Sequence, residues 1–273
     1  MNTRTLDQIR AASPLVHCIT NYVTVNDVAN VLLAIGARPI MADDSEEVEE
    51  ITALCAGLCL NIGTLNARTI PSMIAAGKRA RVLGHPVVLD PVGAGASALR
   101  TATALRILDE VRPALIRGNI SEIRTLAVGS GATQGVDASA ADAVTEENLM
   151  ASADALRTFA ARTGAVVAVT GAIDLVTNGS DCYAIRNGRA EMARVTGTGC
   201  QLSALLAAAL AAVPSDPLAA AAETVALMGA AGEIAWVQMG ECDGNATYRT
   251  RIIDAVYCLT DEELAARMNI MKL

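Results

Sequence analysis

The sequence predicts an α/β fold with a mostly parallel central sheet, antiparallel strands at one edge and helices on both faces. Up to residue 170, apolar runs of strand length alternate with segments of helical period, which is typical of parallel sheets covered by helices. Short extended segments separated by Asn-Gly pairs follow, and after residue 196 the pattern is nearly all helical. The 273 residues contain no low-complexity linker, repeat or break in composition, so we expect one domain, residues 1–273.

The parallel strands are expected at six apolar segments, each followed by a helical pattern. They are residues 15–19, 38–41, 58–62, 86–90, 114–117 and 165–170. One of the helices is predicted to begin at Ser45, because Glu46, Glu47 and Glu49 then fall in its first turns, where acidic groups favour the positive end of the helix dipole.

Three further extended segments, residues 173–177, 182–185 and 190–195, are predicted to form the antiparallel edge. Asn178-Gly179 and Asn187-Gly188 separate them. Asn-Gly readily adopts the positive φ angles of a tight hairpin turn, so both pairs are interpreted as hairpins.

The composition excludes several classes of protein. Hydrophobic residues make up 52% and charged residues 18%, which excludes a disordered chain. A net charge of −8 repels polyanions, and an aromatic content of 2% leaves few side chains for base stacking. We therefore expect no nucleic-acid partner.

The cysteines and the N-terminus indicate a cytoplasmic protein. The seven cysteines are scattered, without zinc-ligand spacing, and are interpreted as reduced thiols. Arg4, Asp7 and Arg10 interrupt the segment where a signal peptide would be apolar. The longest uninterrupted apolar run, 204–213, is shorter than the ~18 residues of a membrane span, so no membrane partner is expected.

In open α/β sheets, ligands bind beyond the carboxyl ends of the strands, so polar residues at those ends are the candidates. The most informative segment is Thr-Gly-Thr-Gly-Cys at 196–200, which leads directly into an apolar helix. Free amides at Gly199, Cys200 and Gln201, together with the helix dipole, would bind a phosphate or a developing anion. An ordinary tight turn is the alternative interpretation.

Cys200 stands at the start of that helix. There the dipole would lower the thiol pKa from about 8.5 and favour the thiolate. Alternatively, the residue is a small buried apolar side chain, as free cysteines commonly are.

Asp90 and Glu122 each follow a strand, and two carboxylates at neighbouring strand ends could hold Mg²⁺ directly or through water. Asp90-Pro91 also fits a simple turn. Asn119 and Glu122 also fit a capping box, in which the Glu carboxylate accepts from the first helical amides. The two roles of Glu122 are compatible.

Arg117 ends another strand, where its guanidinium could bind phosphate oxygens or form a surface ion pair. A Walker phosphate loop is excluded, because lysine occurs only at 78 and 272, without the required glycine spacing. The Gly-x-Gly-x-x-Ala match at 93–98 is weak evidence for dinucleotide binding, because Asp90-Pro91 separates it from the strand.

Five segments in this order resemble the hydroxyethylthiazole kinase family of the ribokinase-like superfamily. They are Asn21 with 26–33, 36–41 (Gly-Ala-Arg-Pro-Ile-Met), 90–95 (Asp-Pro-Val-Gly-Ala-Gly), 117–122 (Arg-Gly-Asn-Ile-Ser-Glu) and 195–200 (Val-Thr-Gly-Thr-Gly-Cys). The likeness runs from about Val16 to the C-terminal helices. It implies a ribokinase-like fold and phosphorylation of the hydroxyl of 4-methyl-5-(2-hydroxyethyl)thiazole by ATP, a salvage step of thiamine biosynthesis.

The resemblance also implies roles for individual residues. The thiazole would contact Asn21, Val23, Met41, Gly63 and Gly197; ATP would contact Arg117, Asn119 and Thr170; Mg²⁺ would be organised by Asp90 and Glu122; and Gly197, Thr198 and Gly199 would form an anion hole. Cys200 stands where related kinases carry an aspartate base, a departure typical of thiazole kinases. The family implies a homotrimer with sites between subunits.

Two other functions remain open. One is a kinase of the same fold that acts on a pyrimidine alcohol or on pyridoxal, against which Cys200 and Met41 argue. The other is a ligand-binding protein without turnover, since a fold can keep a pocket without its chemistry.

Overall fold

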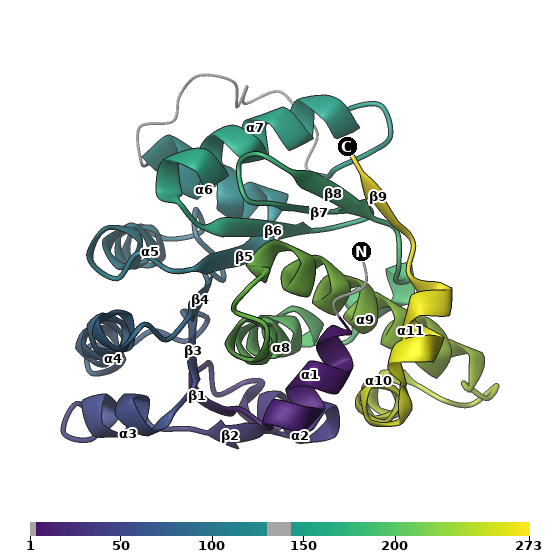
Figure 1. The fold of residues 1–273 in the computed structure, drawn as a ribbon, viewed down its shortest axis with the longest axis horizontal. Coiled ribbons are helices and arrows are strands. Elements are labelled where there is room, and N and C mark those ends of the chain that lie inside the picture. The colour runs from purple at the N-terminus through teal and green to yellow at the C-terminus, as the bar shows by residue number, and fades with distance from the viewer. Residues whose placement is uncertain (1–3, 130–142) are drawn as a thin grey trace.

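The computed structural model describes residues 4–129 and 143–273, and within them the strands form one nine-stranded sheet (Figure 1). Their order across the sheet is β2 (Arg38–Ile40), β1 (Leu15–Ile19), β3 (Gly57–Asn61), β4 (Val87–Asp90), β5 (Leu115–Asn119), β6 (Val166–Thr170), β7 (Asp174–Thr177), β8 (Cys182–Ile185) and β9 (Ile270–Lys272). The first six strands are parallel, and the last three pair antiparallel. The predicted fold class is confirmed.

Helices cover both faces of the sheet (Figure 1). One face packs against α3 (Val48–Leu54), α4 (Thr69–Leu83), α5 (Ala98–Glu110), α6 (Ile120–Gly129) and α7 (Leu149–Thr163). The other packs against α1 (Thr5–Ala12), α2 (Val25–Ile35), α8 (Thr198–Ala212), α9 (Pro217–Val237), α10 (Asn245–Cys258) and α11 (Asp261–Arg267). Each face has its own cluster of buried apolar side chains.

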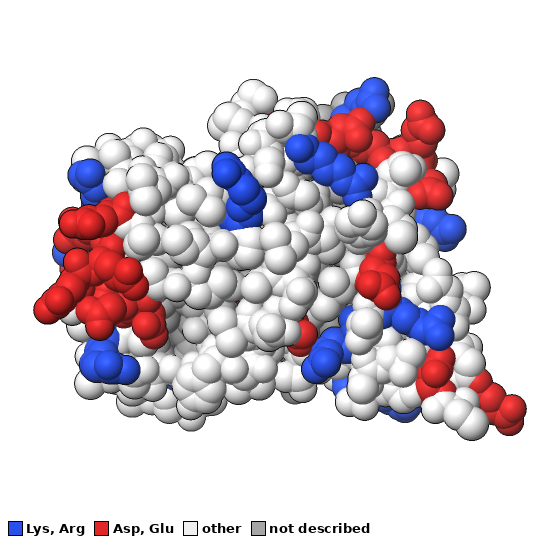
Figure 2. Space-filling model, turned by 90° about the horizontal axis from the view of Figure 1, so that it is seen from below, with Lys and Arg blue, Asp and Glu red and all other residues white. Residues whose placement is uncertain are grey.

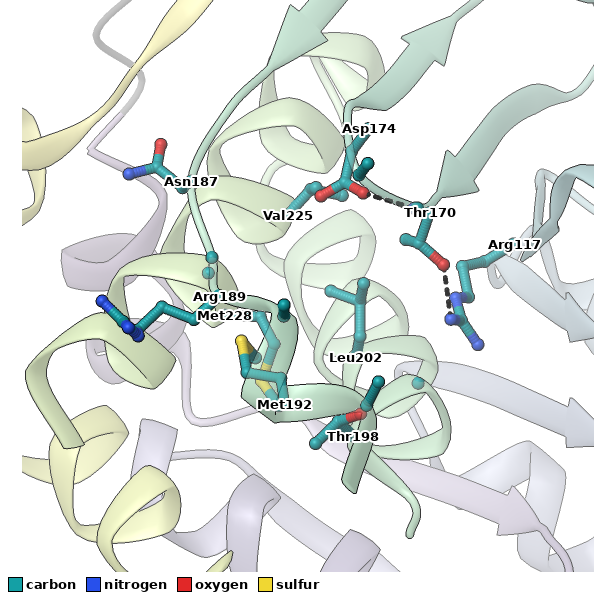
Figure 3. A pocket seen from close by; sticks show the side chains of 17 residues that line it. Arg117, Thr170, Asp174, Asn187, Arg189, Met192, Thr198, Leu202, Val225 and Met228 are labelled. Carbon is teal, nitrogen blue, oxygen red and sulfur yellow. Dashed lines mark hydrogen bonds between the residues drawn. The ribbon is translucent and has the colours of Figure 1, made fainter. Parts of the chain in front are cut away.

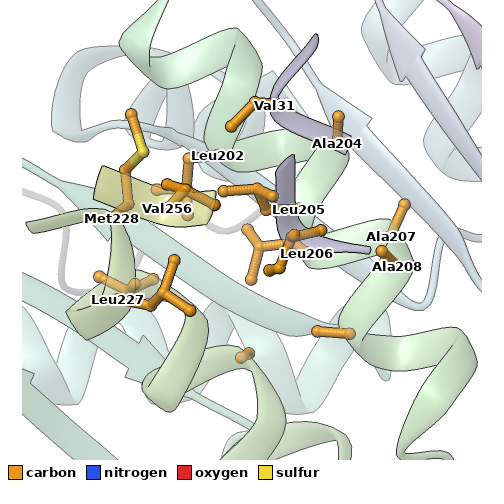
Figure 4. Packing of buried hydrophobic residues seen from close by; sticks show 14 of the residues in the cluster. Val31, Leu202, Ala204, Leu205, Leu206, Ala207, Ala208, Leu227, Met228 and Val256 are labelled. Carbon is orange, nitrogen blue, oxygen red and sulfur yellow. The ribbon is translucent and has the colours of Figure 1, made fainter. Parts of the chain in front are cut away.

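The helix α8 lies close against the sheet because small residues meet there. A Cβ on Gly57 of β3 would lie 3.0 Å from the carbonyl oxygen of Ala207. On its other sides α8 buries Leu202, Leu205 and Leu206 among side chains of the neighbouring helices (Figure 4). This packing fixes the N-terminus of α8 over the carboxyl ends of the central strands.

The edge of the sheet differs from the prediction. Asn178-Gly179 does join β7 to β8, but residues 190–194 form a 3₁₀ helix, η1 (Ala190–Arg194), where a strand was expected. Gly188 has a φ of 113°, and its N–H donates to Glu233 on α9, so the chain turns away from the sheet. The vacant edge of β8 pairs with β9, a strand in the part of the chain that was expected to be helical.

The helix predicted to begin at Ser45 begins at Val48. Residues 45–47 form a turn in which Asp44 accepts from the amide of Glu46, and Glu47 is the N-cap. The acidic residues around this turn, Asp43, Asp44, Glu46, Glu47, Glu49 and Glu50, are exposed. Figure 2 shows them as the acidic cluster on the α3 side of the molecule, next to a broad uncharged area.

The helix α9 is, among the described residues, the one helix long and apolar enough to cross a membrane. Its apolar window is 89% buried inside the fold, and it packs against α8, α10 and β6 to β8. This burial is what a core helix requires.

Candidate active site

A continuous line of polar side chains crosses the carboxyl ends of five adjacent parallel strands. They are Asn21 after β1, Asn61 of β3, Asp90 of β4, Arg117 of β5 and Thr170 of β6. Asn21 Nδ2 donates to Asn61 Oδ1 (3.0 Å), and Asn61 Nδ2 donates to Asp90 Oδ2 (2.8 Å). Asp90 Oδ1 lies 3.6 Å from Arg117 Nη1, and Arg117 Nη2 donates to Thr170 Oγ1 (2.6 Å). The strand order thus assembles residues that are far apart in sequence.

Asp90 is the buried anion of this line, with no exposed surface. Burial raises the pKa of its carboxyl group to about 6, opposed by the charge of Arg117 and by hydrogen bonds from Ser203 and Asn61. The Ser203 hydroxyl donates to Oδ2 (2.9 Å), while Oδ1 accepts no hydrogen bond and faces Arg117. At neutral pH the ionised Asp90 therefore holds the guanidinium in place.

The N-terminus of α8 supplies free backbone donors beside this line. Gly197 is the N-cap, with a φ of 95° and no side-chain cap, so the first helical amides, those of Thr198, Gly199 and Cys200, have no acceptor within the helix. The prediction that the amide of Gln201 is free is wrong: it donates to the carbonyl of Gly197 (2.8 Å), because the first helical hydrogen bond already forms there.

Two glycines let neighbouring groups approach the start of α8. A Cβ on Gly197 would overlap the Thr24 side chain, and a Cβ on Gly199 would overlap the guanidinium of Arg117. Arg117 therefore lies directly against the helix start. A positive charge, three free amides and the positive end of the helix dipole converge at one point.

Cys200 occupies the first turn of α8, and its half-buried thiol accepts a hydrogen bond from Asn21 Nδ2 (3.2 Å). Burial, followed by the negative charge of Asp90, raises the pKa of the Cys200 thiol; hydrogen bonds from Thr24, Asn21 and Asn61 oppose this. The expectation that the dipole lowers this pKa is therefore wrong. Desolvation is the largest effect, and the thiol is neutral at physiological pH.

A cavity of about 590 Å³ opens beside the helix start. Figure 3 shows Arg117, Thr170 and Thr198 at one end of it and Met192, Met228, Arg189 and Asn187 toward the other. Val225 and Leu202 line its middle. Of the residues implied to contact ATP, Arg117 and Thr170 line this cavity, while the Asn119 side chain accepts from the amide of Glu122 (2.8 Å).

The residues implied to contact thiazole lie on the other side of Cys200. Asn21, Gly63 and Gly197 are close together: the Gly63 amide donates to Asn61 Oδ1, and Thr24, which packs against Gly197, donates to Asn21 Oδ1. Val23 is 64% exposed, and Met41 is partly buried at the end of β2.

The carboxylates of Asp90 and Glu122 are close enough for Glu122 to raise the pKa of Asp90. Glu122 Oε1 accepts from the Gly93 amide (2.8 Å), and Oε2 accepts from the Asn119 amide (2.9 Å), so the predicted capping box is confirmed. No group of three or more His, Cys, Asp or Glu side chains forms a metal cage in the described ranges. Two hard oxygen donors, one of them without a hydrogen bond, suit an Mg²⁺ ion that keeps several waters.

Sequence reasoning missed Asn61, Ser203 and Thr24. Asn61 is 1% exposed and connects Asn21 to Asp90. Like Asp90, it is a polar residue at the carboxyl end of an apolar strand, so the same rule applied to that strand would have found it. Ser203 lies one helical turn after Gly199, but only the tertiary packing of α8 shows that it meets Asp90.

The family model and the relatives that match this chain all belong to one family. A model of the hydroxyethylthiazole kinase family matches residues 6–262. A hydroxyethylthiazole kinase of Clostridium acetobutylicum is 54% identical over 95% of both chains, and one of Desulfovibrio desulfuricans is 48% identical over 98% of this chain and 97% of its own.

Solved structures agree with these relatives. The structure of a hydroxyethylthiazole kinase protein from Pyrococcus horikoshii has a TM-score of 0.87 at 35% identity, covering 98% of this chain and 97% of that one. A ribokinase-like superfamily protein from Enterococcus faecalis, with a TM-score of 0.61 at 10% identity over 92% of this chain and 93% of its own, shares the fold.

Proposed function

This chain belongs to the hydroxyethylthiazole kinase family, and we propose that it transfers the γ-phosphoryl group of ATP to the primary hydroxyl of 4-methyl-5-(2-hydroxyethyl)thiazole, a salvage step of thiamine biosynthesis. The observation that carries the proposal is the position of the α8 N-terminus. Its free amides and Arg117 separate the 590 Å³ cavity on one side from Cys200 and Asn21 on the other.

The triphosphate binds with its γ-phosphoryl group at the anion hole of Gly197, Thr198 and Gly199. The amides of Thr198, Gly199 and Cys200 and the guanidinium of Arg117 neutralise the charge on the oxygens of the moving group, and Thr170 orients Arg117. The substrate oxygen forms a bond to the γ-phosphorus while the bond from that phosphorus to the bridging oxygen of ADP breaks. Positioning and charge neutralisation supply most of the rate, because the loose transition state makes little demand on a base.

The thiazole alcohol binds among Asn21, Val23, Met41, Gly63 and Gly197. Its hydroxyl points at Cys200, whose sulfur is oriented by Asn21. Because the pKa of the thiol is raised, Cys200 positions the hydroxyl instead of removing its proton at the outset. The proton leaves for an oxygen of the phosphoryl group or for water as the new bond forms.

Mg²⁺ is the metal that we propose for this site, held through water by Asp90 and Glu122 next to the phosphates. When bound, it would neutralise phosphate charge. The carboxylates have a role of their own in this chain: Asp90 fixes Arg117, and Glu122 fixes the Gly93 loop and the start of α6. Asn119, which stands just before α6, would lie next to the nucleotide phosphates.

The assembly and location are also proposals. Tyr22 and Val23, next to Asn21, are 76% and 64% exposed, so the thiazole side of the site lacks an apolar cover in a single chain. A homotrimer with sites between subunits would supply one, and light scattering should give three times the monomer mass. We also propose one domain, which should unfold in a single transition, and a cytoplasmic location, where ATP is available.

The test is an ADP-release assay with the thiazole alcohol, pyridoxal and a pyrimidine alcohol as acceptors. We expect release that depends on the thiazole alcohol and exceeds that with the other two acceptors. Release with pyridoxal or the pyrimidine alcohol alone would assign a different acceptor. No release with any acceptor, despite ATP binding, would favour a ligand-binding protein without turnover.

A further inference from the structure

Asp174, the first residue of β7, places a carboxylate on the wall of the cavity that the mechanism above does not use. Figure 3 shows it beside Val225 on the Thr170 side of the cavity, across from Met192 and Met228. A nucleotide bound in this cavity would therefore lie within reach of the carboxylate.

One oxygen of Asp174 has a structural role, and the other is available. Oδ1 accepts from the Gly171 amide (2.8 Å) and closes the turn between β6 and β7. Among the described residues, Oδ2 has no hydrogen-bond or ion-pair partner. Burial raises the pKa of this carboxyl group to about 7, although the hydrogen bond from Gly171 and the charge of Arg117 oppose the rise.

We propose that Asp174 Oδ2 accepts a hydrogen bond from a ribose hydroxyl of ATP and so contributes to the choice of nucleotide. The inference rests on the proposed kinase function. It deepens that function by assigning the middle of the cavity to the sugar.

The distribution of charged and apolar residues along the cavity supports binding of the ribose beside Asp174. Arg117 and the amides of α8 attract the phosphates to one end of the cavity. At the other end Met192 and Met228, next to Arg189 and Asn187, offer apolar surface that suits the faces of a base. Between phosphate and base, the hydrogen-bond donors of ATP are the ribose hydroxyls, and Asp174 supplies an acceptor there.

The test compares ATP, 2′-deoxy-ATP, 3′-deoxy-ATP and ITP with wild-type protein and with Asp174→Asn. The Asn side chain keeps an oxygen for the Gly171 amide but replaces Oδ2 by a donor. We expect wild-type protein to prefer ATP over at least one deoxynucleotide by about tenfold in kcat/KM, and Asp174→Asn to reduce that ratio to about twofold or less. The KM for the thiazole alcohol should stay unchanged.

Asp181→Asn is the matched control, because Asp181 lies on the same hairpin, outside the cavity, and pairs with Lys272. It should keep the wild-type ratio. Equal use of ATP and both deoxynucleotides by wild-type protein would overturn the proposal. An unchanged ratio of kcat/KM for ATP over the deoxynucleotides in Asp174→Asn would also overturn it. If the variant lost only its discrimination between ATP and ITP, Asp174 would contact the base and not the ribose, and the proposal would again fail.

Calorimetric titration of the same nucleotides without acceptor separates this inference from the proposed function. If wild-type protein does not phosphorylate the thiazole alcohol, the kinase assignment fails. The ratio of dissociation constants for ATP and the deoxynucleotides still decides whether Asp174 binds the ribose.

Discussion

The side-chain amide of Asn21 donates to the thiol of Cys200 across 3.2 Å, joining the end of the first strand of the chain to the start of α8. The same amide group donates to Asn61, which donates to Asp90. The thiol is therefore held by the network that also fixes Arg117. In the proposed mechanism, orientation of the substrate hydroxyl and neutralisation of phosphate charge would therefore depend on one set of contacts.

Cys200→Ser tests whether the thiol orients or deprotonates. Because a hydroxyl can accept from Asn21 and contact the substrate equally well, we expect the variant to keep kcat within about tenfold of wild type. Cys200→Asp should keep or raise the rate, since a carboxylate is a better acceptor. Steady-state kinetics with circular dichroism as the folding control measures both, and complete inactivity of two folded variants would contradict an orienting role.

Asn61→Ala tests the link between Asn21 and Asp90. Removing the amide leaves Asn21 Nδ2 without its Asn61 acceptor and Asp90 Oδ2 with Ser203 alone, so we expect a loss of about 1–3 kcal/mol of stability. We also expect kcat to fall about tenfold while the KM for ATP changes little. Iodoacetamide should label Cys200 more slowly, because loss of the Asn61 hydrogen bond raises the pKa of the thiol further. Asn30→Ala, at an exposed asparagine of α2, is the control. If stability alone changed, Asn61 would not position the reacting groups.

Gly199→Ala tests the contact between α8 and Arg117. The new Cβ would displace the guanidinium, so we expect kcat/KM for ATP to fall about a hundredfold, as when an oxyanion donor is lost. Gly244→Ala is the matched control, because a Cβ there meets no atom within 4 Å. Unchanged kinetics in the Gly199 variant would show that the position of Arg117 is not critical.

Glu122→Gln tests the proposed metal role. The amide oxygen can still accept one backbone hydrogen bond, so the fold should be retained, whereas the lost charge should raise the Mg²⁺ concentration needed for half-maximal activity several-fold. A Mg²⁺ titration identical to wild type would remove Glu122 from the metal site.

The stability of the protein should depend on the charge of Asp174. The pKa is about 7 in the folded protein and has an ordinary value of 3.8, so between these values the folded state binds a proton that the unfolded chain lacks. Stability relative to Asp174→Asn should therefore rise as pH falls from 8 to 5, by about 1 kcal/mol after allowance for partial exposure. Thermal unfolding at both pH values measures the difference, and a constant difference would place the carboxyl pKa below this window.

The parallel strands and the residues at their ends could be predicted because both depend on local patterns. The capping box of Asn119 and Glu122 was predictable for the same reason. By contrast, the 3₁₀ helix at residues 190–194 depends on the contact of Gly188 with Glu233, and the pairing of β9 depends on the edge that this turn leaves open. Neither the 3₁₀ helix nor the pairing of β9 can be predicted from the residues of that element alone.

The pKa of Cys200 illustrates a similar limit in the site. The helix dipole can be inferred from the sequence, but burial beside Asp90, which is 110 residues away, follows only from the packing of α8 on the sheet. Asn61 could have been predicted, because it is a polar residue at the carboxyl end of a parallel strand. Ser203 and Asp174 are recognised only by their tertiary neighbours.

The most direct measurement is a crystal structure with the thiazole alcohol and a non-hydrolysable ATP analogue. We expect the γ-phosphoryl group within hydrogen-bond distance of the Thr198, Gly199 or Cys200 amides, the acceptor hydroxyl beside Cys200, and the ribose next to Asp174. A triphosphate bound elsewhere, with side chains covering the start of α8, would contradict this mechanism.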